Sequence, residues 1–550
     1  RNACITCHGA MGKRQLDTDS EAAGKGPGDF QLSFLRIADR NDPNFKYGGL
    51  ARDGISCQVC HRNAPDQVPP GVPPLEYFLK NSITGHFPVS PAEELYGPFK
   101  DNEISPYAMT TGTGITPKLN SYLQSSRMCG SCHTIDMPVV DSPIKGESRL
   151  EQATYLEWLN SQYQTEFGTP GPNAKSCGDC HMPTDYHNPA KGLDVPQIEQ
   201  KMAIIEDETY PEADHRVPLD QINVRVRNEG YRRHEFLGLN VFLLEMFDQF
   251  NDVLGVRKDD YMSTSTTDLQ DTVDNYVQQA RSTTARLTTS ATVTGPLQIQ
   301  ADVAVTNLTG HRFPSGVGFR RAFIELLVYS NQWEHGQQKV VWSSGRTNSL
   351  GVIVDANGNP LPSEFFAEYT DSNGIKKQAY QPHYEVISQQ NQVQIYEELT
   401  RNAAGKFTTN FTLRDDSPKD NRLLPIGWTA NGPDPSLNGR FLHATHPEGN
   451  AAEDPDYQDG KGTDHITYQI QLPPGTDPAT CRVQATLYYQ SIPPYYLNQR
   501  FAAAPNEDAT KRLYYLTSNL NVTGTPPKET PVKNWKLLID SASAIPATKR

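Results

Sequence analysis

The sequence predicts a multidomain α+β protein: a loop-rich N-terminal domain with few helices, a helical connector and an all-β sandwich domain. Three observations lead to this fold class: four Cys-X-X-Cys-His motifs in the first third, helical periodicity in the middle, and alternating apolar and polar residues in the last half. The chain has 550 residues, 42 prolines and 40 glycines, which allows several domains and much loop. The predicted domains are residues 1–199, 200–289 and 290–525, followed by an irregular tail at 526–550.

The motifs of the first domain have the form of haem-attachment sites. They are Cys4–His8, Cys57–His61, Cys129–His133 and Cys177–His181, and they contain eight of the nine cysteines. In each motif, two thiols can bond to the vinyl groups of one haem while the adjacent histidine ligates its iron. We therefore predict a tetrahaem domain with four haem c groups. The attachment residues are Cys4, Cys7, Cys57, Cys60, Cys129, Cys132, Cys177 and Cys180, and the proximal ligands are His8, His61, His133 and His181.

Two other kinds of site use paired cysteines. Zinc sites can be built from two Cys-X-X-Cys pairs, and thioredoxin-like proteins use one such pair for redox chemistry. Zinc does not require a histidine after every second cysteine, and a redox pair needs only one copy. Haem attachment therefore explains the four motifs better.

The second axial position of each iron decides between electron transfer and catalysis. A strong ligand leaves a closed haem that passes electrons, whereas a vacant position lets a substrate bind. Ten of the fourteen histidines remain for these four positions. Sequence context selects His234, His311, His86 and His215 as distal candidates, with His187 and Met109 as weaker candidates.

The connector shows two helical patterns. Residues 236–254 are apolar almost all round, which is typical of a buried helix. In residues 268–287 the apolar side chains fall on one face, which is typical of a surface helix. Residues 200–289 are therefore predicted to be helical and to present distal haem ligands.

After residue 288 the hydrophobic period becomes two. Alternating residues predict strands near 297–305, 466–472 and 483–489, and the continuous apolar run 321–329 predicts a central strand. Asn-Gly pairs separate these segments and indicate turns. The region is predicted to be a sandwich of roughly seven to nine strands. Cys481 is expected to be a buried free thiol in one of them.

Charge and hydropathy restrict the partners. The net charge of −14 argues against nucleic acid and anionic membrane surfaces, and it would suit basic redox partners. No apolar run reaches the roughly eighteen residues of a membrane span. The first motif begins at residue 4, so we expect that an upstream export signal has been removed. The acidic stretch 453–464 could bind Ca²⁺, although a solvated loop is the more ordinary interpretation.

Several segments carry a resemblance. They are GISCQVCHR (54–62), YGPF (96–99), CGDCHMP (177–183), RRHEFLGLN (232–240), TGHRFPSG (309–316), VQIYE (393–397) and KDNRLLPIG (419–427). In these, the chain resembles a family of exported bacterial multihaem cytochromes c with a haem-free β domain behind the motifs. The resemblance implies haem ligation by His234 and His311. Similar sequences often carry a histidine before the third motif, where this chain has residues such as Tyr107 and Met109.

The leading interpretation is an exported electron carrier, periplasmic, cell-surface or extracellular, that serves a redox partner protein or an extracellular acceptor. A first alternative is a subunit of an extracellular cytochrome filament, in which a neighbouring subunit donates a ligand to the haem of the first motif. A second alternative is a multihaem reductase or oxidase with one open iron. Because all four motifs end in histidine, electron transfer is favoured over catalysis.

Overall fold

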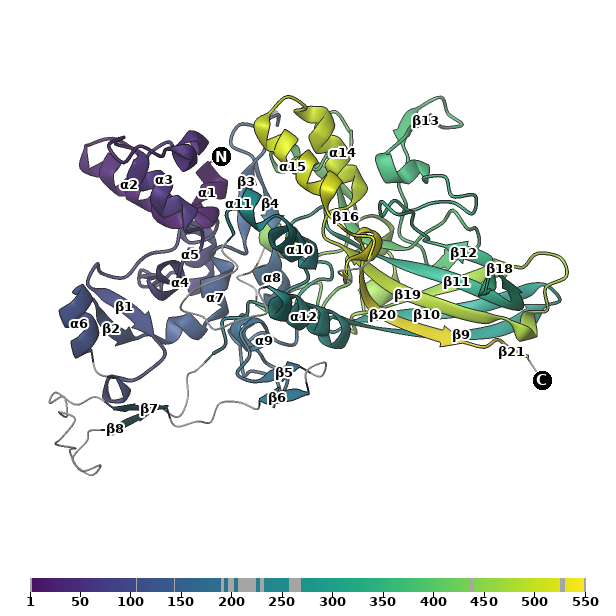
Figure 1. Ribbon diagram of the computed structural model, residues 1–550, viewed down its shortest axis with the longest axis horizontal. Coiled ribbons are helices and arrows are strands. Elements are labelled where there is room, and N and C mark those ends of the chain that lie inside the picture. The colour runs from purple at the N-terminus through teal and green to yellow at the C-terminus, as the bar shows by residue number, and fades with distance from the viewer. Residues whose placement is uncertain are drawn as a thin grey trace. The chain divides into compact units, whose positions relative to one another are not determined.

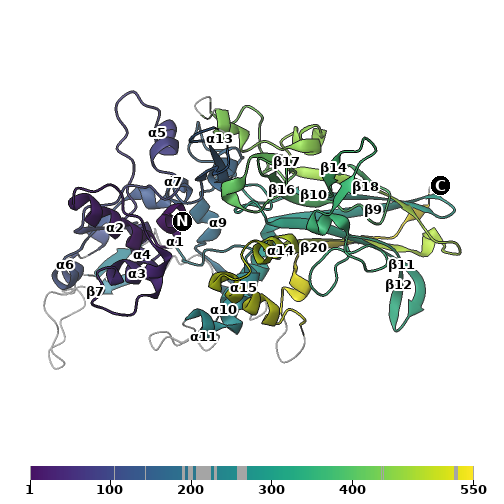
Figure 2. The same cartoon turned by 90° about the horizontal axis from the view of Figure 1, so that it is seen from above.

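The computed structural model divides into two compact units. The first unit comprises Arg1–Asp136 and Lys175–Phe236, and the second comprises Met137–Ala174 and Leu237–Arg550. Both are drawn in Figure 1 and Figure 2. The structure describes residues 2–104, 106–142, 144–188, 192–195, 202–205, 224–227, 232–256, 269–434, 437, 439–524 and 530–548. Helices and a large β-rich part are both present, so the multidomain α+β prediction holds at this level.

The division into units differs from the predicted domains in two places. Residues 137–174, predicted to belong to the N-terminal domain, join the second unit. Helix α8 (Thr154–Leu159) explains this, because its side chains are almost completely buried there. Asn160, just after the helix, donates to the carbonyl oxygen of Thr429 (2.9 Å). The predicted connector is also divided, at Phe236.

The first unit consists of short helices and small sheets joined by loops. Its described elements are α1 (Asn2–His8), α2 (Ala10–Ala22), η1 (Leu32–Arg36), α3 (Phe45–Arg52), α4 (Cys57–His61), α5 (Pro74–Asn81), β1 (Glu94–Gly97), η2 (Asp101–Glu103), α6 (Tyr107–Thr113), β2 (Thr116–Leu119), η3 (Ser121–Gln124), α7 (Ser126–Gly130), α9 (Cys177–His181), β5 (Tyr186–Asn188), β6 (Leu193–Val195), β7 (Met202–Ile205) and β8 (Val224–Arg227); β3 (Ile135–Pro138) spans the division. Among the described residues of this unit, apolar side chains form small clusters, for example around Phe30 and around Phe87.

The second unit contains two sheets. One has the order β15-β18-β10-β9-β21, and the other has the order β17-β16-β11-β19-β20 with β12 paired to β11. Their strands are β9 (Ala285–Gly295), β10 (Gln298–Asn307), β11 (Arg321–Glu334), β12 (Gln337–Ser344), β15 (Val386–Ile387), β16 (Ile395–Arg401), β17 (Asp416–Asp420), β18 (Thr463–Gln471), β19 (Arg482–Gln490), β20 (Leu537–Ala544) and β21 (Ala547–Thr548). Buried residues of both sheets, such as Ile299 and Leu487, share one core cluster. The unit is therefore a two-sheet sandwich.

Smaller elements complete the second unit. They are β4 (Ser148–Gln152), α10 (Val241–Gln249), α11 (Asn251–Leu254), α12 (Gln270–Gln279), the π turn η5 (Ala280–Thr284), η6 (Pro362–Phe365), β13 (Glu368–Thr370), β14 (Lys376–Gln378), η7 (Phe411–Leu413), α13 (Gly439–His443), η8 (Gly449–Ala452), η9 (Pro455–Tyr457), η10 (Pro478–Thr480), α14 (Pro494–Ala503), α15 (Asp508–Asn519) and η11 (Lys533–Trp535). Cys481 follows η10 directly before β19 and is a buried free thiol, as predicted.

The strands predicted from alternation are confirmed as β10, β18 and β19, and the continuous run becomes β11. Two other predictions were wrong. The helix predicted from residue 236 begins only at Val241: Phe236 has a left-handed backbone (φ 48°), and Asn240, with ψ 48°, is still not helical. Phe250 divides the helix into α10 and α11. The tail predicted to be irregular contains β20, whose buried Leu537 and Ile539 belong to the sandwich core.

The second predicted helix is shorter than expected. It was predicted over residues 268–287, but α12 ends at Gln279, and the π turn η5 leads into β9. The β-branched pair Thr283-Thr284 disfavours further helix, and the two-residue alternation of β9 already begins at Ala285. Residues 202–205 and 224–227, inside the predicted helical connector, are strands β7 and β8.

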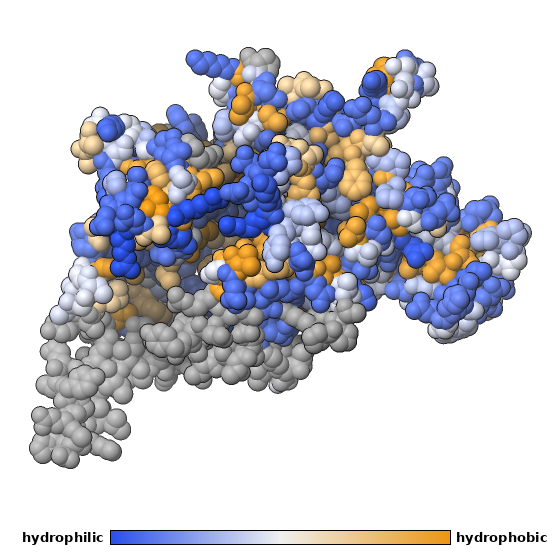
Figure 3. Space-filling model, turned by 45° about the horizontal axis from the view of Figure 1, so that its top comes forward, coloured by the Kyte–Doolittle hydropathy of each residue, from blue (hydrophilic) through white to orange (hydrophobic). Residues whose placement is uncertain are grey.

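In the described part of the chain, no helix has both the length and the apolar character that crossing a bilayer requires. On the face shown in Figure 3, apolar residues form small patches among polar and charged ones. This mixed pattern is ordinary for a protein surface in contact with water.

Paired charges are buried deep in the second unit. Both Arg321 and Glu364 are 1% exposed, and they form two parallel bonds of 2.7 and 2.8 Å. Glu364 also accepts the backbone N–H of Ile353 (2.9 Å). Arg312 and Arg422 share the carboxylate of Asp420. Such groups are tolerated inside a protein only when their charges and hydrogen bonds are satisfied.

We predict that Glu364→Gln lowers the free energy of unfolding of the second unit by about 3–5 kcal/mol, because it leaves the buried guanidinium of Arg321 without its counter-charge. Urea unfolding followed by tryptophan fluorescence measures this, since all five tryptophans lie in the second unit. The control is Glu334→Gln, which disrupts an exposed pair with Lys339 (3.8 Å) and should change stability by less than about 0.5 kcal/mol. Equal effects of the two variants would contradict the prediction.

Candidate functional site

All four Cys-X-X-Cys-His motifs lie in the first unit, and each forms a helical turn. The second and fourth motifs are α4 and α9, and the first ends α1. In the third, the turn of α7 continues past its end, because the N–H of His133 donates to the carbonyl oxygen of Cys129 (2.9 Å). Residues three apart in a helix lie on one side. Both thiols of each motif therefore face the same side of their turn.

Hydrogen bonds fix the start of the helical turn in the fourth motif. The hydroxyl of Ser176 accepts the N–H of Asp179 (3.2 Å), and the Asp179 carboxylate accepts the N–H of Ser176 (2.7 Å), which is a capping box around the fourth motif. Arg232 forms an ion pair with the same carboxylate. The N–H of Arg233 donates to the carbonyl oxygen of Pro183 (3.0 Å). The segment before His234 is thus anchored to the fourth motif.

The thiols of different motifs lie beside one another. A hydrogen bond with Cys132 and burial raise the pKa of Cys7, and the same bond lowers the pKa of Cys132. A hydrogen bond with Cys177 raises the pKa of Cys129. All nine cysteines lie in the described part of the chain, and all are free thiols. The third motif therefore contributes one cysteine beside the first motif and the other beside the fourth.

The imidazole of His61 is held in one orientation. Its Nδ1 lies 2.7 Å from the carbonyl oxygen of Tyr96, in the YGPF segment. A ring that donates from Nδ1 to a carbonyl presents Nε2 as a ligand atom. The ring centre of His61 is 6.1 Å from that of His234, with an angle of 31° between the planes. The predicted proximal ligand of the second motif and a predicted distal ligand are thus neighbours.

His86 is exposed and oriented in a similar way. Its Nδ1 lies 3.0 Å from the carbonyl oxygen of Ile83. The guanidinium of Arg14 donates to the carbonyl oxygens of both neighbours of His86, Gly85 (3.2 Å) and Phe87 (2.6 Å). It also lies 4.0 Å above the Phe87 ring. Arg14 therefore holds the backbone on both sides of His86, a role that the sequence did not suggest.

The loop that carries His86 lies between two motifs. The N–H of Gly85 donates to the carbonyl oxygen of Ser131 in the third motif (2.8 Å). Gly85 has φ +78°, and a Cβ there would lie 2.9 Å from Cys7 Sγ in the first motif. Only glycine fits this left-handed, crowded position. His86 is consequently placed beside the first and third motifs.

For the remaining distal candidates, the structure does not decide whether they ligate a haem. His311 lies in the second unit, where its Nδ1 is 2.8 Å from the carbonyl oxygen of Arg312. His215 lies outside the described residues, and only the backbone of His187 is described, in β5. Met109 is half-buried in α6. The predicted roles of these four residues stay predictions.

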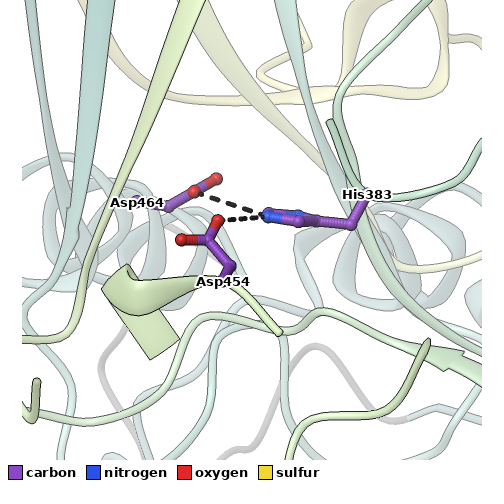
Figure 4. Close-up of side chains that lie close together, drawn as sticks. All are labelled: His383, Asp454 and Asp464. Carbon is purple, nitrogen blue, oxygen red and sulfur yellow. Dashed lines mark hydrogen bonds and ion pairs between the residues drawn. The ribbon is translucent and has the colours of Figure 1, made fainter. Parts of the chain in front are cut away.

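A second polar cluster, which sequence reasoning missed, lies in the core of the second unit (Figure 4). His383 Nε2 is 2.7 Å from Asp454 Oδ2 and 3.8 Å from Asp464 Oδ1, and all three side chains are buried. The two aspartates come from the acidic stretch for which Ca²⁺ was considered. Their sequence signal was acidity alone, and His383 carried none.

The amide groups around His383 decide the position of its proton. Gln394 Oε1 accepts the N–H of Tyr384 (3.0 Å), so Gln394 Nε2 donates to His383 Nδ1 (2.9 Å). Asn421 Oδ1 accepts the N–H of Glu397 (3.1 Å), which points Asn421 Nδ2 at the same Nδ1 (3.3 Å). Nδ1 is therefore an acceptor, and the ring proton lies on Nε2, facing the carboxylates.

This tautomer matters because the donor types resemble a metal site. A ring nitrogen that carries a proton has no lone pair for a metal ion, so the arrangement favours a hydrogen-bonded cluster. Ca²⁺ also prefers about six to eight oxygen ligands, and the acidic stretch places only two carboxylates here. The calcium prediction gains no support from these residues and remains untested.

The two carboxylates of the cluster differ. Burial acts to raise the pKa of Asp454, but the hydrogen bond from His383 lowers it below its ordinary value. Burial raises the pKa of Asp464 to about 6, against the effects of His383, Tyr396 and Gln394. Asp464 Oδ1 is buried and accepts no hydrogen bond among the described residues. Asp464 is therefore the carboxylate of the cluster whose ionised form is destabilised by burial.

Comparisons with known proteins add little. No protein-family model matches the chain, and no curated protein matches it. A solved structure, a penta-heme cytochrome c552 from Thermochromatium tepidum, aligns with 94% of this chain and 84% of its own, with a TM-score of 0.41 and 13% sequence identity. A TM-score of 0.41 is too low for this similarity to support a conclusion about fold or function.

We predict that Asp464→Asn stabilises the second unit above pH 6. Because the pKa of Asp464 is raised in the folded state, its contribution to stability is full below the unfolded pKa of about 3.9 and is lost as the pH rises through about 6. The variant should lose this pH dependence and gain about 1–2 kcal/mol at pH 8. Urea unfolding at pH 5 and pH 8 measures it.

The control is Asp459→Asn, which changes an exposed carboxylate of the same acidic stretch that pairs with Lys461 (2.9 Å). It should follow the wild type at both pH values. A variant Asp464→Asn that is less stable than the wild type at pH 8 would show that the ionised carboxylate is needed, for example to hold a cation.

Proposed function

We propose that the first unit binds four haem c groups covalently, one at each Cys-X-X-Cys-His motif, and that the chain transfers electrons. The supporting geometry comes from the motifs themselves. The two thiols of each motif lie on one side of a helical turn, and none of them is in a disulfide. The motifs also lie close together, since the third has a thiol beside the first and another beside the fourth. Bound haem supplies a one-electron iron couple.

The neighbouring imidazoles of His61 and His234 carry this proposal. Two imidazoles that ligate one metal ion, each at about 2 Å, have ring centres about 6 Å apart. The observed separation is 6.1 Å. The hydrogen bond from His61 Nδ1 to the carbonyl oxygen of Tyr96 leaves Nε2 as its ligand atom. We therefore assign His234 as the distal ligand of the second motif.

His86 is proposed as a second distal ligand. Its Nδ1 is bound to a carbonyl oxygen, and Arg14 holds the backbone on both sides, so Nε2 is presented in a fixed direction. Its loop contacts the first and third motifs, which limits the choice to these two. Strong ligands on both sides of an iron favour electron transfer over substrate binding.

The proposed setting is outside the cytoplasm, where haem is attached to such motifs. The partner would be a redox protein or an extracellular acceptor. Its docking surface would be basic, because the net charge of −14 favours and orients positively charged partners over distance.

We predict that His234→Ala opens one haem in four. Loss of the distal imidazole leaves one iron five-coordinate, so the visible spectrum should show one high-spin haem, while the pyridine haemochrome still gives four haems per chain. The control is His335→Ala, which changes an exposed histidine of the second unit. An unchanged spectrum in the first variant would contradict the assignment of His234. Fewer than four haems in the wild type would contradict the proposed function itself.

A second prediction concerns the dithionite-reduced wild type exposed to carbon monoxide. If every iron has two protein ligands, the spectrum should not change, because carbon monoxide needs an open position. A change that corresponds to one haem would show an open iron and would favour the reductase alternative. The His234→Ala variant is the positive control, since its open iron should bind carbon monoxide.

A further inference from the structure

The distal ligand proposed for the second haem lies in a segment without regular secondary structure. Residues 232–238 belong to no helix or strand, and His234 itself is exposed. Phe236 has a left-handed backbone (φ 48°), and its ring centre lies 6.0 Å from that of His234. The repeating hydrogen bonds of a helix or a sheet therefore do not fix the position of this imidazole, and other contacts have to do so.

Two contacts tie the segment to the fourth motif. Arg232 forms an ion pair with Oδ1 of Asp179, which stands between the two cysteines of that motif. The backbone N–H of Arg233 donates to the carbonyl oxygen of Pro183, two residues after the histidine of the motif (3.0 Å). The chain is thus held at both of the residues that directly precede His234.

The carboxylate of Asp179 is itself held in place. Its Oδ2 accepts the backbone N–H of Ser176 (2.7 Å) and the Ser176 hydroxyl (2.9 Å), and its own N–H donates back to that hydroxyl (3.2 Å). These bonds cap the turn of the fourth motif, and the second oxygen, Oδ1, accepts from Arg232. The two carboxylate oxygens therefore serve two different segments of the chain.

The exposure of the ion pair indicates what it does. The side chains of Arg232 and Asp179 are 31% and 34% exposed, and pairs of this kind contribute little to the free energy of unfolding. The pair does, however, join a fixed carboxylate to a loop residue two positions before a proposed haem ligand. Groups that surround a metal ligand in this way determine its orientation.

We propose that Asp179 and Arg232 are positioning residues for His234, so that ligation of the second haem depends on a carboxylate in the attachment motif of the fourth. The inference rests on the proposed function, in which His234 is the distal ligand of the second motif. The ring planes of His61 and His234 are inclined by 31°. Loss of the ion pair would release the backbone before His234 and change this angle, while the cysteines of the fourth motif would stay as they are.

The test is electron paramagnetic resonance of the oxidised full chain with its haems bound. The low-spin signal of a haem with two imidazole ligands depends on the angle between the ring planes, so a change in orientation is visible. His234→Ala should remove one low-spin signal. Arg232→Ala should shift that same signal or convert part of it to high spin, and Asp179→Asn, which keeps an oxygen for the cap but loses the charge, should act in the same direction.

Two further variants serve as controls. Arg232→Lys keeps the positive charge and a donor for Asp179 Oδ1, so its spectrum should stay close to that of the wild type. Arg149→Ala breaks an exposed ion pair with Glu147 (2.7 Å) in the second unit and should leave all four haem signals unchanged.

The double variant Arg232→Ala/His234→Ala separates positioning from general loosening of the structure. Once the imidazole is gone, Arg232 has no ligand to position, so the double variant should have the spectrum of His234→Ala alone. The proposal is overturned if Arg232→Ala keeps every wild-type signal, if Arg232→Lys changes the signal as much as Arg232→Ala does, or if the double variant alters a further haem.

Failure of the proposed function would look different. Fewer than four haems per chain in the pyridine haemochrome of the wild type would overturn that function, and this inference with it. Four haems and an unchanged signal in His234→Ala would overturn the ligand assignment and the inference but not electron transfer. If Asp179→Asn loses a haem, Arg232→Ala decides alone, because it changes no residue of any motif.

Discussion

The arrangement of the first unit depends on the contacts of its third Cys-X-X-Cys-His motif. Cys132 lies beside Cys7 of the first motif, and it packs on a small apolar cluster with Val59 of the second. Cys129 lies beside Cys177 of the fourth motif. The backbone N–H of Cys177 donates to the hydroxyl of Ser126, just before the third motif (3.1 Å). The other three motifs therefore meet at one short helical turn. These contacts join four segments that are far apart in the sequence.

The two units are held by different forces. The second has a continuous apolar core between two sheets and buried ion pairs with nearly complete hydrogen bonding. The first has several small apolar clusters. Four haem groups would add apolar surface where side chains supply little, so cofactor binding and folding of the first unit would be linked. Within the first unit, the hydrogen bonds of Arg14 orient the loop that carries His86.

Two buried acidic sites in the second unit show how local hydrogen bonding decides chemistry. Around His383, the side-chain amides of Gln394 and Asn421 donate to Nδ1, so the ring proton lies on Nε2 and faces Asp454 and Asp464. A histidine with two aspartates would by itself suggest a metal site, but this proton position favours a hydrogen-bonded cluster. Around Glu151, burial leaves Oε1 without a hydrogen-bond partner among the described residues. Burial raises the pKa of Asp464 and the pKa of Glu151.

The sequence by itself determined the four motifs and the local periodicity of the strands. The spacing of cysteines and histidine within each motif specifies the predicted attachment sites, and two-residue alternation identified β10, β18 and β19, because both depend only on neighbouring residues. Helix ends were less predictable, as the left-handed backbone at Phe236 shows. Tertiary structure alone decided that His234 lies beside His61 and that Arg14 orients the His86 loop. These relations join residues far apart in the chain, and no periodic pattern encodes them.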